Sequence, residues 1–397
     1  MEKFVVVVGG ELFNKGAQAL SFTVIDNIKK KHPEAKIVML SSMDYKRSKE
    51  ELENYNFEVL PFSIDMKLQL LGGLYKPLGS LISLRKNAPE NMNIRVKYIL
   101  QNSIMFIDIS GFALSSQRGN IASMQYLFNL KVASKFGIPT YLFPQSFGPF
   151  NYGKLTTIMK SQIKKELLKA EKIYAREKDG IAKLKELGIY DVEKSNDIVL
   201  QHKKEYTLSN IYINPPQMEQ IEIKRNAVGI IPNVKIIKHG NEDKIFELYY
   251  SYIKLLLKFN KKIYILRHSH EDSIVMNRIK SEFQDNKNII YLDQDYSCIQ
   301  IDDIMGNFDY IIGSRYHSIV HSYKNFTPAI VIGWAVKYEE LLSTFEQENY
   351  SLDVRKEIDL EKAVNTLNIM EMNYSNEREK IKKIYNGKID DKVFTTI

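Results

Sequence analysis

An arginine, a histidine and a lysine follow the ends of two apolar runs in the last third of the sequence. Arg315 and His317 come after Asp309 to Ile312, and Lys337 comes after Ala329 to Trp334. Both runs have the length of buried strands and are separated by a segment of helix length, which predicts a β-α-β unit with parallel strands. Open α/β sheets bind ligands at the carboxyl ends of such strands. These three side chains could hold a small anion and supply a proton.

His321 lies four residues after His317, so both imidazoles would share one face of a helix, with the spacing of a metal-binding pair. However, Ser318 stands where a metalloprotease carries its glutamate, and Arg315 is no metal ligand. We therefore predict no metal site and favour a packed or hydrogen-bonded His321. His317 is the better candidate for acid/base catalysis, because an imidazole can be tuned to titrate near neutral pH.

Polar side chains also follow other predicted strands. Arg267, His268 and His270 place three ionisable groups within four residues after one strand of the second half. Arg176 ends a strand of the first half, and its planar guanidinium suits bidentate binding of a carboxylate or phosphate. A surface ion pair is the commoner role of a single arginine in such a place.

Two loops of the first half have residues suited to ligand contact. Gly16 is the last of three glycines between the first predicted strand and the first helix, where glycine lets a ligand approach the backbone. The spacing does not match the dinucleotide fingerprint GxGxxG. Ser115, Gln117 and Arg118 follow the fourth strand and carry groups suited to sugar hydroxyls or phosphate, although a polar surface loop explains them equally well.

Strand-like runs alternate with amphipathic, helix-like segments in both halves, which predicts two doubly wound, Rossmann-like α/β domains facing a cleft. The predicted strands are Phe4 to Val8, Lys36 to Ser41, Phe57 to Phe62, Ile104 to Ile109, Thr140 to Pro144, Lys172 to Ala175, Ala227 to Pro232, Lys262 to Arg267, Asn288 to Leu292 and the two runs named first. The predicted helices are Ala17 to Lys31, Ile121 to Phe136, Lys154 to Ala170, Asp179 to Leu187, Asp243 to Phe259, Asp272 to Phe283, Ile301 to Phe308 and Leu360 to Tyr385.

The alternation lapses over residues 201–226, a polar stretch that contains Pro215 and Pro216. We therefore predict an N-terminal domain over residues 1–200, a linker over 201–226 and a C-terminal domain over 227–350. The helical segment over 351–397 is expected to pack back across the hinge.

Composition excludes several classes of protein. A chain of 397 residues is longer than one hydrophobic core usually supports, so two domains are expected. Its shares of 44% apolar and 26% charged residues are those of a soluble protein. The single cysteine, Cys298, excludes an internal disulfide and a multi-cysteine metal site. The N-terminus resembles a first strand rather than a secretory signal, and no run approaches the roughly 20 apolar residues of a membrane span. A cytoplasmic location is expected.

The net charge of +8 permits an anionic partner. No nucleic-acid motif accompanies it, so an acidic glycan, a phosphorylated small molecule or an anionic membrane surface is favoured. The segment from Met66 to Leu84 is leucine-rich, is broken by glycine and proline, and has lysines nearby. It could lie on an anionic bilayer, at its inner face, or line a site for a lipid-linked acceptor. A helix packed on its own domain is the favoured interpretation.

Four motifs together resemble the polysaccharide pyruvyl transferase family. GSRYH, which begins at Gly313, and the following TPAIVIGWAVKY resemble its GxRxH signature and trailing Lys-Tyr. NKGAQAL, PQSFGP and AREKDG are similar to its Asn-x-Gly, Gln-x-x-Gly-Pro and Ala-Arg-Glu segments. The motifs run from about residue 9 to 338. Ala17 stands where an acidic residue often follows the glycine, and Phe112 interrupts a glycine-rich run; both departures fall on the acceptor side.

The resemblance implies a GT-B type fold, phosphoenolpyruvate as donor, and a sugar of a cell-surface polysaccharide or its lipid-linked precursor as acceptor. The product would be a cyclic pyruvate ketal, formed with release of phosphate and without a cofactor. The residues expected to be catalytic are His317 and Arg315. Donor contacts are expected from Arg315, Lys337, Arg176, Arg267, His268 and His270, and acceptor contacts from Asn14, Gly16, Ser115, Gln117, Arg118 and Gln145.

Two other functions stay open on the sequence. A GT-B glycosyltransferase that uses a nucleotide sugar would explain the fold and one Glu-x7-Glu match, from Glu340 to Glu348. A non-catalytic protein of glycan assembly would also keep the fold. The retained Arg315, His317 and Lys337 count against that second alternative.

Overall fold

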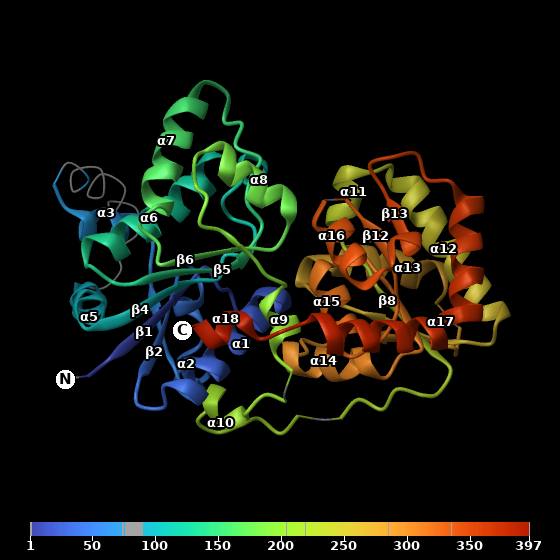
Figure 1. Ribbon diagram of the computed structural model, residues 1–397. Coiled ribbons are helices and arrows are strands. Elements are labelled where there is room, and N and C mark those ends of the chain that lie inside the picture. Colours follow the sequence, from blue (N-terminus) through green and yellow to red (C-terminus); the bar gives the residue numbers. More distant parts are fainter. Residues whose placement is uncertain are drawn as a thin grey trace. The chain divides into compact units, whose positions relative to one another are not determined.

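The computed structural model describes residues 2–73, 75, 90–203, 205–218, 220–284, 286–334 and 336–396. The chain divides into two compact units. The first unit comprises Met1–Phe13, Leu20–Gln217 and Asp391–Ile397, and the second comprises Asn14–Ala19 and Met218–Asp390. Each unit contains one parallel sheet with helices packed on it (Figure 1).

The first unit holds a seven-stranded sheet in the order β3-β2-β1-β4-β5-β6-β7. Its strands are β1 (Phe4–Val8), β2 (Lys36–Ser41), β3 (Glu58–Pro61), β4 (Ser103–Asp108), β5 (Thr140–Gln145), β6 (Lys172–Ala175) and β7 (Glu193–Lys194). Its helices are α1 (Lys15–Lys31), whose first residues belong to the second unit, and α2 (Lys49–Asn54), α3 (Ile64–Leu71), α5 (Glu90–Gln101), α6 (Asn120–Lys135), α7 (Thr156–Leu167), α8 (Lys178–Glu186), α9 (Ile198–Gln201), α10 (Leu208–Ile211) and α18 (Lys392–Thr396).

The second unit holds a six-stranded sheet in the order β10-β9-β8-β11-β12-β13. Its strands are β8 (Ala227–Ile231), β9 (Lys262–Leu266), β10 (Ile289–Leu292), β11 (Tyr310–Gly313), β12 (Ala329–Gly333) and β13 (Ser351–Asp353). Its helices are α11 (Lys235–His239), α12 (Glu242–Lys258), α13 (Ser273–Glu282), α14 (Cys298–Gly306), α15 (Tyr316–Lys324), α16 (Val336–Phe345) and α17 (Leu360–Lys388). The strand order reverses between β8 and β11, which is the place where doubly wound sheets bind ligands.

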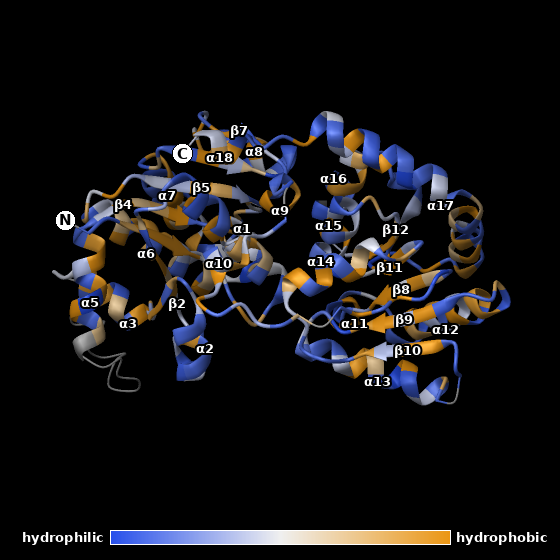
Figure 2. Ribbon diagram, turned by 90° about the horizontal axis from the view of Figure 1, so that it is seen from below, coloured by the Kyte–Doolittle hydropathy of each residue, from blue (hydrophilic) through white to orange (hydrophobic). Residues whose placement is uncertain are grey.

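The strands are apolar because both faces of each sheet are covered, as is usual for parallel sheets. Every residue of β1 and of β8 is buried. Figure 2 shows β8 and β9 as mainly hydrophobic strands, whereas much of α17 is hydrophilic. Gly229 in β8 leaves room for an aromatic ring, since a Cβ there would lie only 2.6 Å from Cε2 of Phe308.

The predicted α/β fold of two Rossmann-like sheets is confirmed. The bounds predicted for β1, β2 and β6 agree with those observed, and most other predicted elements differ by one or two residues. The predictions omitted strands β7 and β13 and several helices, which are α2, α5, α9, α10, α11, α16 and α18. β7 and β13 are only two and three residues long, and their side chains are partly exposed, so they carry no apolar run. Of the predicted linker, residues 201–217 belong to the first unit and include α10.

The leucine-rich segment from Met66 to Leu84 falls partly outside the described residues. Its described beginning lies in α3, where Met66, Lys67 and Leu68 are buried. Among the residues that the structure describes, no helix combines the length and apolarity required to cross a bilayer.

A buried carboxyl group lies at the carboxyl end of β4. Oδ1 of Asp108 accepts a 2.9 Å hydrogen bond from the backbone N–H of Ser110, and the side chain is fully buried. Burial raises the pKa of Asp108 to about 6, against smaller lowering effects of Ser110, Asn129 and Lys67. Burial likewise lowers the pKa of Lys67 to about 8.

This carboxyl group makes stability depend on pH. An aspartate of an unfolded chain titrates near 3.9, so a raised folded-state pKa means that ionisation destabilises the fold as the pH rises from about 4 to about 6, by up to about 3 kcal/mol. Asp108→Asn should therefore raise the free energy of unfolding at pH about 7.5 by about 1–3 kcal/mol and change it little at pH about 4. Urea unfolding at the two pH values measures this difference, and an equal effect at both would contradict it.

Candidate active site

The junction between β11 and α15 is fixed by hydrogen bonds around one buried serine. The backbone N–H of Ser314 donates to the carbonyl of Ile231 over 3.0 Å, and its Oγ lies 2.7 Å from the hydroxyl of Tyr249. Its carbonyl accepts from Nδ2 of Asn233 at 2.9 Å and from the hydroxyl of Tyr338 at 3.0 Å. Strands β8 and β11 and helices α12 and α16 are thereby tied to one turn, so the residues that follow start from a rigid position.

Arg315 caps α15 and is held by two carboxylates. Its Nε and Nη2 donate to the two oxygens of Asp272, at 2.9 and 2.5 Å, and Nη2 also donates to Glu271 at 2.8 Å. Burial would lower the pKa of Arg315, but Asp272 and Glu271 raise it above its ordinary value, so the guanidinium stays charged. Its Nη1 has no acceptor among the described residues. Nη1 is therefore available to an anionic ligand.

His317 packs against a glycine of α1. A Cβ on Gly16 would lie 2.3 Å from Nδ1 and 2.5 Å from Cγ of His317, well inside contact distance. Tyr316 meets the same imidazole edge to face, with ring centroids 5.3 Å apart. Asn14 begins this part of the chain, and its Oδ1 accepts from the backbone N–H of Gly16 at 3.0 Å. The absence of a side chain at Gly16 is therefore what allows the imidazole its position.

His268 is a second imidazole of the second unit. It is 2% exposed, and neither ring nitrogen has a hydrogen-bond partner among the residues that the structure describes. Burial is the main reason that its pKa lies well below the ordinary value, and the nearby positive groups lower it further. Those groups are Arg315, His321, His317 and Lys15. A neutral imidazole inside a cationic cluster can donate to an anion without adding charge.

Arg267 and His270 contact each other and the loop after β10. The guanidinium of Arg267 donates to the carbonyl of Asp293, and its Nη1 lies 3.2 Å from Nδ1 of His270. The two side chains therefore brace the loop after β10. The expected donor contact of His268 stays a prediction that its burial supports, and the contacts expected of Arg267 and His270 stay predictions without such support.

Lys337 lies in the first turn of α16 among aromatic rings. Its Nζ is 4.9 Å from the ring centroid of Tyr316 and 5.7 Å from that of Tyr338. Trp334 is 5.8 Å away and stacks on His239, with ring centroids 4.2 Å apart. The ammonium group is thus positioned by cation–π contacts beside the residue that precedes His317.

Arg176 belongs to the first unit, where it joins three segments. Its Nη1 forms a 2.7 Å ion pair with Asp197, and Nη2 donates to the carbonyl of Gly111 at 2.9 Å and to Oγ of Ser146 at 2.8 Å. The side chains of Arg176 and Asp197 are 4% and 0% exposed. These contacts give Arg176 a structural role, and its expected donor contact remains a prediction.

The residues expected to contact the acceptor divide between the units. Gln145 is fully buried, and its Oε1 has no partner among the described residues. Oγ of Ser115 accepts from the backbone N–H of Gln117 at 3.1 Å, while Gln117 and Arg118 are exposed. These four residues lie in the first unit, as Arg176 does, whereas Asn14 and Gly16 lie in the second unit with His317.

Sequence reasoning missed the groups that hold the site in place. Asp272 stands next to the predicted RHSH cluster, so a search for an anionic partner of Arg315 could have proposed it. Lys15, which forms a 2.8 Å ion pair with Asp295, is the middle residue of the NKG motif. Asp302 pairs with His321 from another helix, and no local pattern in the sequence indicates this pairing.

Among the described residues, no group of three or more His, Cys, Asp or Glu side chains could hold a metal ion.

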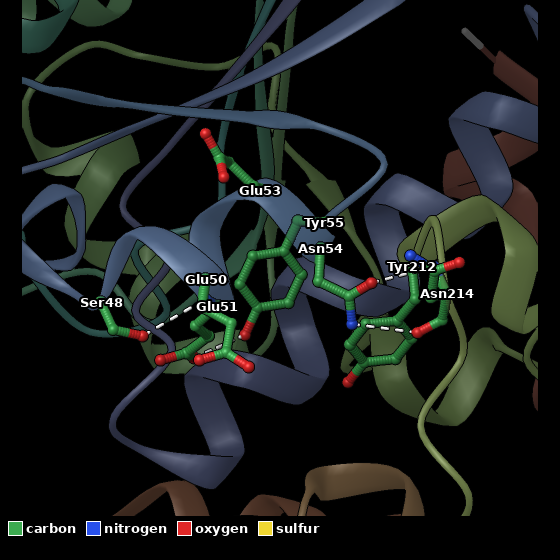
Figure 3. Close-up of a pocket in the computed structure, with 8 residues that line it drawn as sticks. All are labelled: Ser48, Glu50, Glu51, Glu53, Asn54, Tyr55, Tyr212 and Asn214. Atoms are coloured by element: carbon green, nitrogen blue, oxygen red, sulfur yellow. Dashed lines mark hydrogen bonds between the residues drawn. The ribbon is translucent and has the colours of Figure 1, made fainter.

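A cavity in the first unit is lined by none of the site residues that were predicted from the sequence. This cavity has a volume of about 580 Å³ and lies beside α2, and Figure 3 shows residues that line it. Its walls carry Glu51, whose carboxylate accepts from the hydroxyl of Tyr55 at 2.9 Å, and paired Asn54 and Asn214. Its polar groups thus largely satisfy one another.

Comparison with known proteins assigns a family. A family model described as polysaccharide pyruvyl transferase matches residues 14–335, about four fifths of the chain. No curated protein matches the chain.

Similar solved structures agree on the fold. A UDP-GlcNAc 2-epimerase from Methanocaldococcus jannaschii is 14% identical with a TM-score of 0.57, over 93% of this chain and 92% of its own. A UDP-GlcNAc 2-epimerase from Neisseria meningitidis is 11% identical with a TM-score of 0.56, and the match covers 100% of this chain and 98% of its own. An α,α-trehalose-phosphate synthase from Burkholderia vietnamiensis is 9% identical with a TM-score of 0.55, and the match covers 100% of this chain and 96% of its own. At these identities the likeness establishes the GT-B type fold alone.

Proposed function

The chain belongs to the polysaccharide pyruvyl transferase family, and on this premise we propose that it transfers the enolpyruvyl group of phosphoenolpyruvate to a sugar. The acceptor is a sugar of a cell-surface polysaccharide or of its lipid-linked precursor. The product is a cyclic pyruvate ketal, and phosphate is released. The observation that carries this proposal lies after β11, where Asp272 and Glu271 hold the guanidinium of Arg315 two residues before His317. The buried His268, whose ring nitrogens have no partner among the described residues, adds an imidazole that acts electrostatically with this cluster.

The charges of the cluster suit the donor. Phosphoenolpyruvate carries a carboxylate and a phosphate, so a site that binds it needs fixed positive charge. Arg315 supplies a guanidinium that two carboxylates hold in place. Lys337 supplies an ammonium group that lies over the ring of Tyr316. Such groups bind the two anionic ends and stabilise the charge that develops on the departing phosphate.

The reaction needs one acid and one base. An acid protonates the methylene carbon of the donor, a sugar hydroxyl attacks the neighbouring carbon, the bond from that carbon to the phosphate oxygen breaks, and a second hydroxyl closes the ring. Two hydroxyl protons are lost; one ends on the new methyl group and the other on phosphate. His317 is the acid that protonates carbon or the base that takes the hydroxyl proton.

A glycosyltransferase that uses a nucleotide sugar is the second candidate, because the structural relatives include enzymes of UDP-sugars. The Glu-x7-Glu match gives it little support, since Glu340 lies in α16 and Glu348 lies beyond the end of that helix. Thermal unfolding distinguishes the candidates. Phosphoenolpyruvate at about 100 times its Kd should stabilise the fold by about 2.7 kcal/mol. A shift with UDP and none with phosphoenolpyruvate would favour the second candidate.

Gly16→Ala should reduce turnover strongly without unfolding the protein. The added methyl group would overlap Nδ1 and Cγ of His317, so the imidazole must leave its position. Alanine favours a helix over glycine by about 1 kcal/mol, which limits the loss of stability. We expect kcat for phosphate release from phosphoenolpyruvate to fall at least about tenfold, since general acid/base catalysis contributes more than this.

Gly387→Ala is the matched control, because Gly387 lies in α17 and a Cβ there would meet no atom within 4 Å. It should stabilise the fold by up to about 1 kcal/mol and leave turnover unchanged. Equal turnover in the two glycine variants would contradict the position assigned to His317.

A further inference from the structure

One stretch of the first unit carries positive charge and no negative charge. Residues 109–165 contain seven Lys or Arg residues and no Asp or Glu, whereas acidic residues make up 48 of the 397 positions of the whole chain. The stretch covers α6 and most of α7. A surface with charge of one sign attracts a partner of the opposite sign, so these two helices favour an anionic partner.

Helices α6 and α7 lie side by side on one face of the first sheet (Figure 1). They connect β4, β5 and β6, which are neighbours in the sheet in that order, and right-handed crossovers place both helices on the same face. The hydroxyl of Tyr152, before α7, donates to Oγ of Ser123 in α6 at 3.0 Å. Further along the helices, Nζ of Lys131 donates to Oε1 of Gln162 at 2.9 Å. Their solvent-facing sides therefore form one continuous surface.

Helix α7 carries apolar side chains on its solvent-facing side as well as on its buried side. The buried side is supplied by Met159, Ile163 and Leu167. Ile158 lies outside this core and is 62% exposed, and Leu155, directly before the helix, is 41% exposed. A helix that only packs on its own sheet carries polar residues on the side that faces solvent. The exposed aliphatic side chains are therefore not explained by the packing of the domain.

The solvent-facing side of α6 has the same character. Ile121 is 69% exposed and Met124, one helical turn later, is 37% exposed. Lys164 and Lys165 of α7 are also exposed. The exposed side chains of the two helices define the α6–α7 surface, which comprises Ile121, Met124, Leu155, Ile158, Lys164 and Lys165.

Aliphatic side chains beside lysines suit an anionic lipid bilayer. The aliphatic groups enter the boundary between headgroups and acyl chains, and the ammonium groups bind anionic headgroups. A soluble acidic glycan would pair with the lysines but would leave the aliphatic side chains in water. The combination therefore favours a membrane over a soluble anionic polymer.

The α6–α7 surface adjoins the loop that is expected to contact the acceptor. Ser115, Gln117 and Arg118 come just before α6. Oγ of Ser116 in this loop donates to the carbonyl of Pro149, in the loop before α7, at 2.9 Å. A bilayer in contact with the α6–α7 surface would therefore bring lipid headgroups near the acceptor loop.

We propose that the α6–α7 surface docks on an anionic lipid bilayer and that the acceptor sugar is presented there on a lipid carrier. The docking is independent of the reaction. The role of the lipid carrier rests on the proposed pyruvyl transfer.

Cosedimentation of the full chain with lipid vesicles tests the docking without any substrate. The wild type should bind vesicles of phosphatidylcholine mixed with phosphatidylglycerol, and should bind pure phosphatidylcholine at least about tenfold more weakly. The double variant Lys164→Gln, Lys165→Gln should weaken binding to the mixed vesicles at least about tenfold, because both lysines lose their attraction to anionic headgroups. The double variant Ile121→Asn, Ile158→Asn should also weaken it at least about tenfold, because it removes the side chains that enter the bilayer.

Matched controls change exposed residues of the same types in the second unit. They are Lys382→Gln with Lys383→Gln in α17, and Ile274→Asn in α13. These variants should bind the mixed vesicles as the wild type does. Equal weakening in the controls, or no binding of the wild type to the mixed vesicles, would overturn the proposal. Binding of the wild type to soluble alginate but not to vesicles would assign the surface to an acidic glycan and would overturn it too.

Turnover with two kinds of acceptor separates the docking from the proposed reaction. The variant Lys164→Gln, Lys165→Gln should keep wild-type kcat with a nitrophenyl sugar in solution, and should release phosphate at least about tenfold more slowly with a lipid-linked sugar in the mixed vesicles. Equal rates of wild type and variant on the lipid-linked sugar would overturn the role of the lipid carrier. If the wild type binds the mixed vesicles but releases no phosphate with either acceptor, the proposed reaction fails while the docking stands.

Discussion

His317→Gln is expected to lower kcat for pyruvyl transfer by about 100-fold to 10,000-fold, which is the usual contribution of a positioned acid or base. Glutamine has a size and polarity close to those of histidine, so the contacts with Gly16 and Tyr316 should survive. Stability should change little, and the Kd of phosphoenolpyruvate should rise by less than about tenfold, because Arg315 and Lys337 supply the charge. Steady-state phosphate release and calorimetric binding measure the two quantities.

The control for this variant is His32→Gln, which changes a partly exposed histidine of the first unit that lies outside the site. It should retain wild-type kcat. If His317→Gln also retained wild-type kcat, His317 would have no part in the chemistry.

Arg176→Met is expected to cost about 3–5 kcal/mol of unfolding free energy, because it leaves the carboxylate of Asp197 buried and without its cation. It also removes the donors to Gly111 and Ser146, so the loops after β4 and β5 lose a common anchor. Arg95→Met is the matched control in the same unit. Its bidentate pair with Glu58 is about two fifths exposed on each side and should be worth less than about 1 kcal/mol.

The double variant Arg176→Met, Asp197→Leu separates structure from ligand binding. Removal of both charges should restore much of the lost stability, since a buried ion pair is often replaceable by apolar residues. If Arg176 also contacts the donor, this variant should fold and still bind phosphoenolpyruvate more weakly than the wild type. Equal losses of stability in Arg176→Met and Arg95→Met would contradict the structural role of Arg176.

The sequence predicted those parts of the protein that depend on local pattern. Apolar runs such as Phe4 to Val8 identify strands because parallel strands are buried on both faces, and their alternation with helices indicates the fold. The family was likewise predicted from motif order and is confirmed by the match over residues 14–335. The polar edge strand β7 escaped prediction because it has no such pattern.

Side-chain pairing could not be predicted, because it depends on contacts between distant segments. The sequence shows that Arg315 follows a strand, but not that Asp272 and Glu271 hold two of its nitrogens. It shows His317 and His321 one turn apart, but not that His321 is paired with Asp302 of another helix. The assignment of Asn14 and Gly16 to the acceptor stays a prediction, and the sequence did not show that both belong to the second unit with His317.

Mass spectrometry of the acceptor after incubation with phosphoenolpyruvate tests the central proposal most directly. A panel of nitrophenyl and lipid-linked sugars serves as acceptors, and released phosphate is measured in the same samples. The proposed function predicts that one acceptor gains the mass of a pyruvate ketal, with one phosphate released for each ketal formed. An acceptor that instead gains a sugar from a UDP-sugar, with no pyruvyl product from phosphoenolpyruvate, would contradict it.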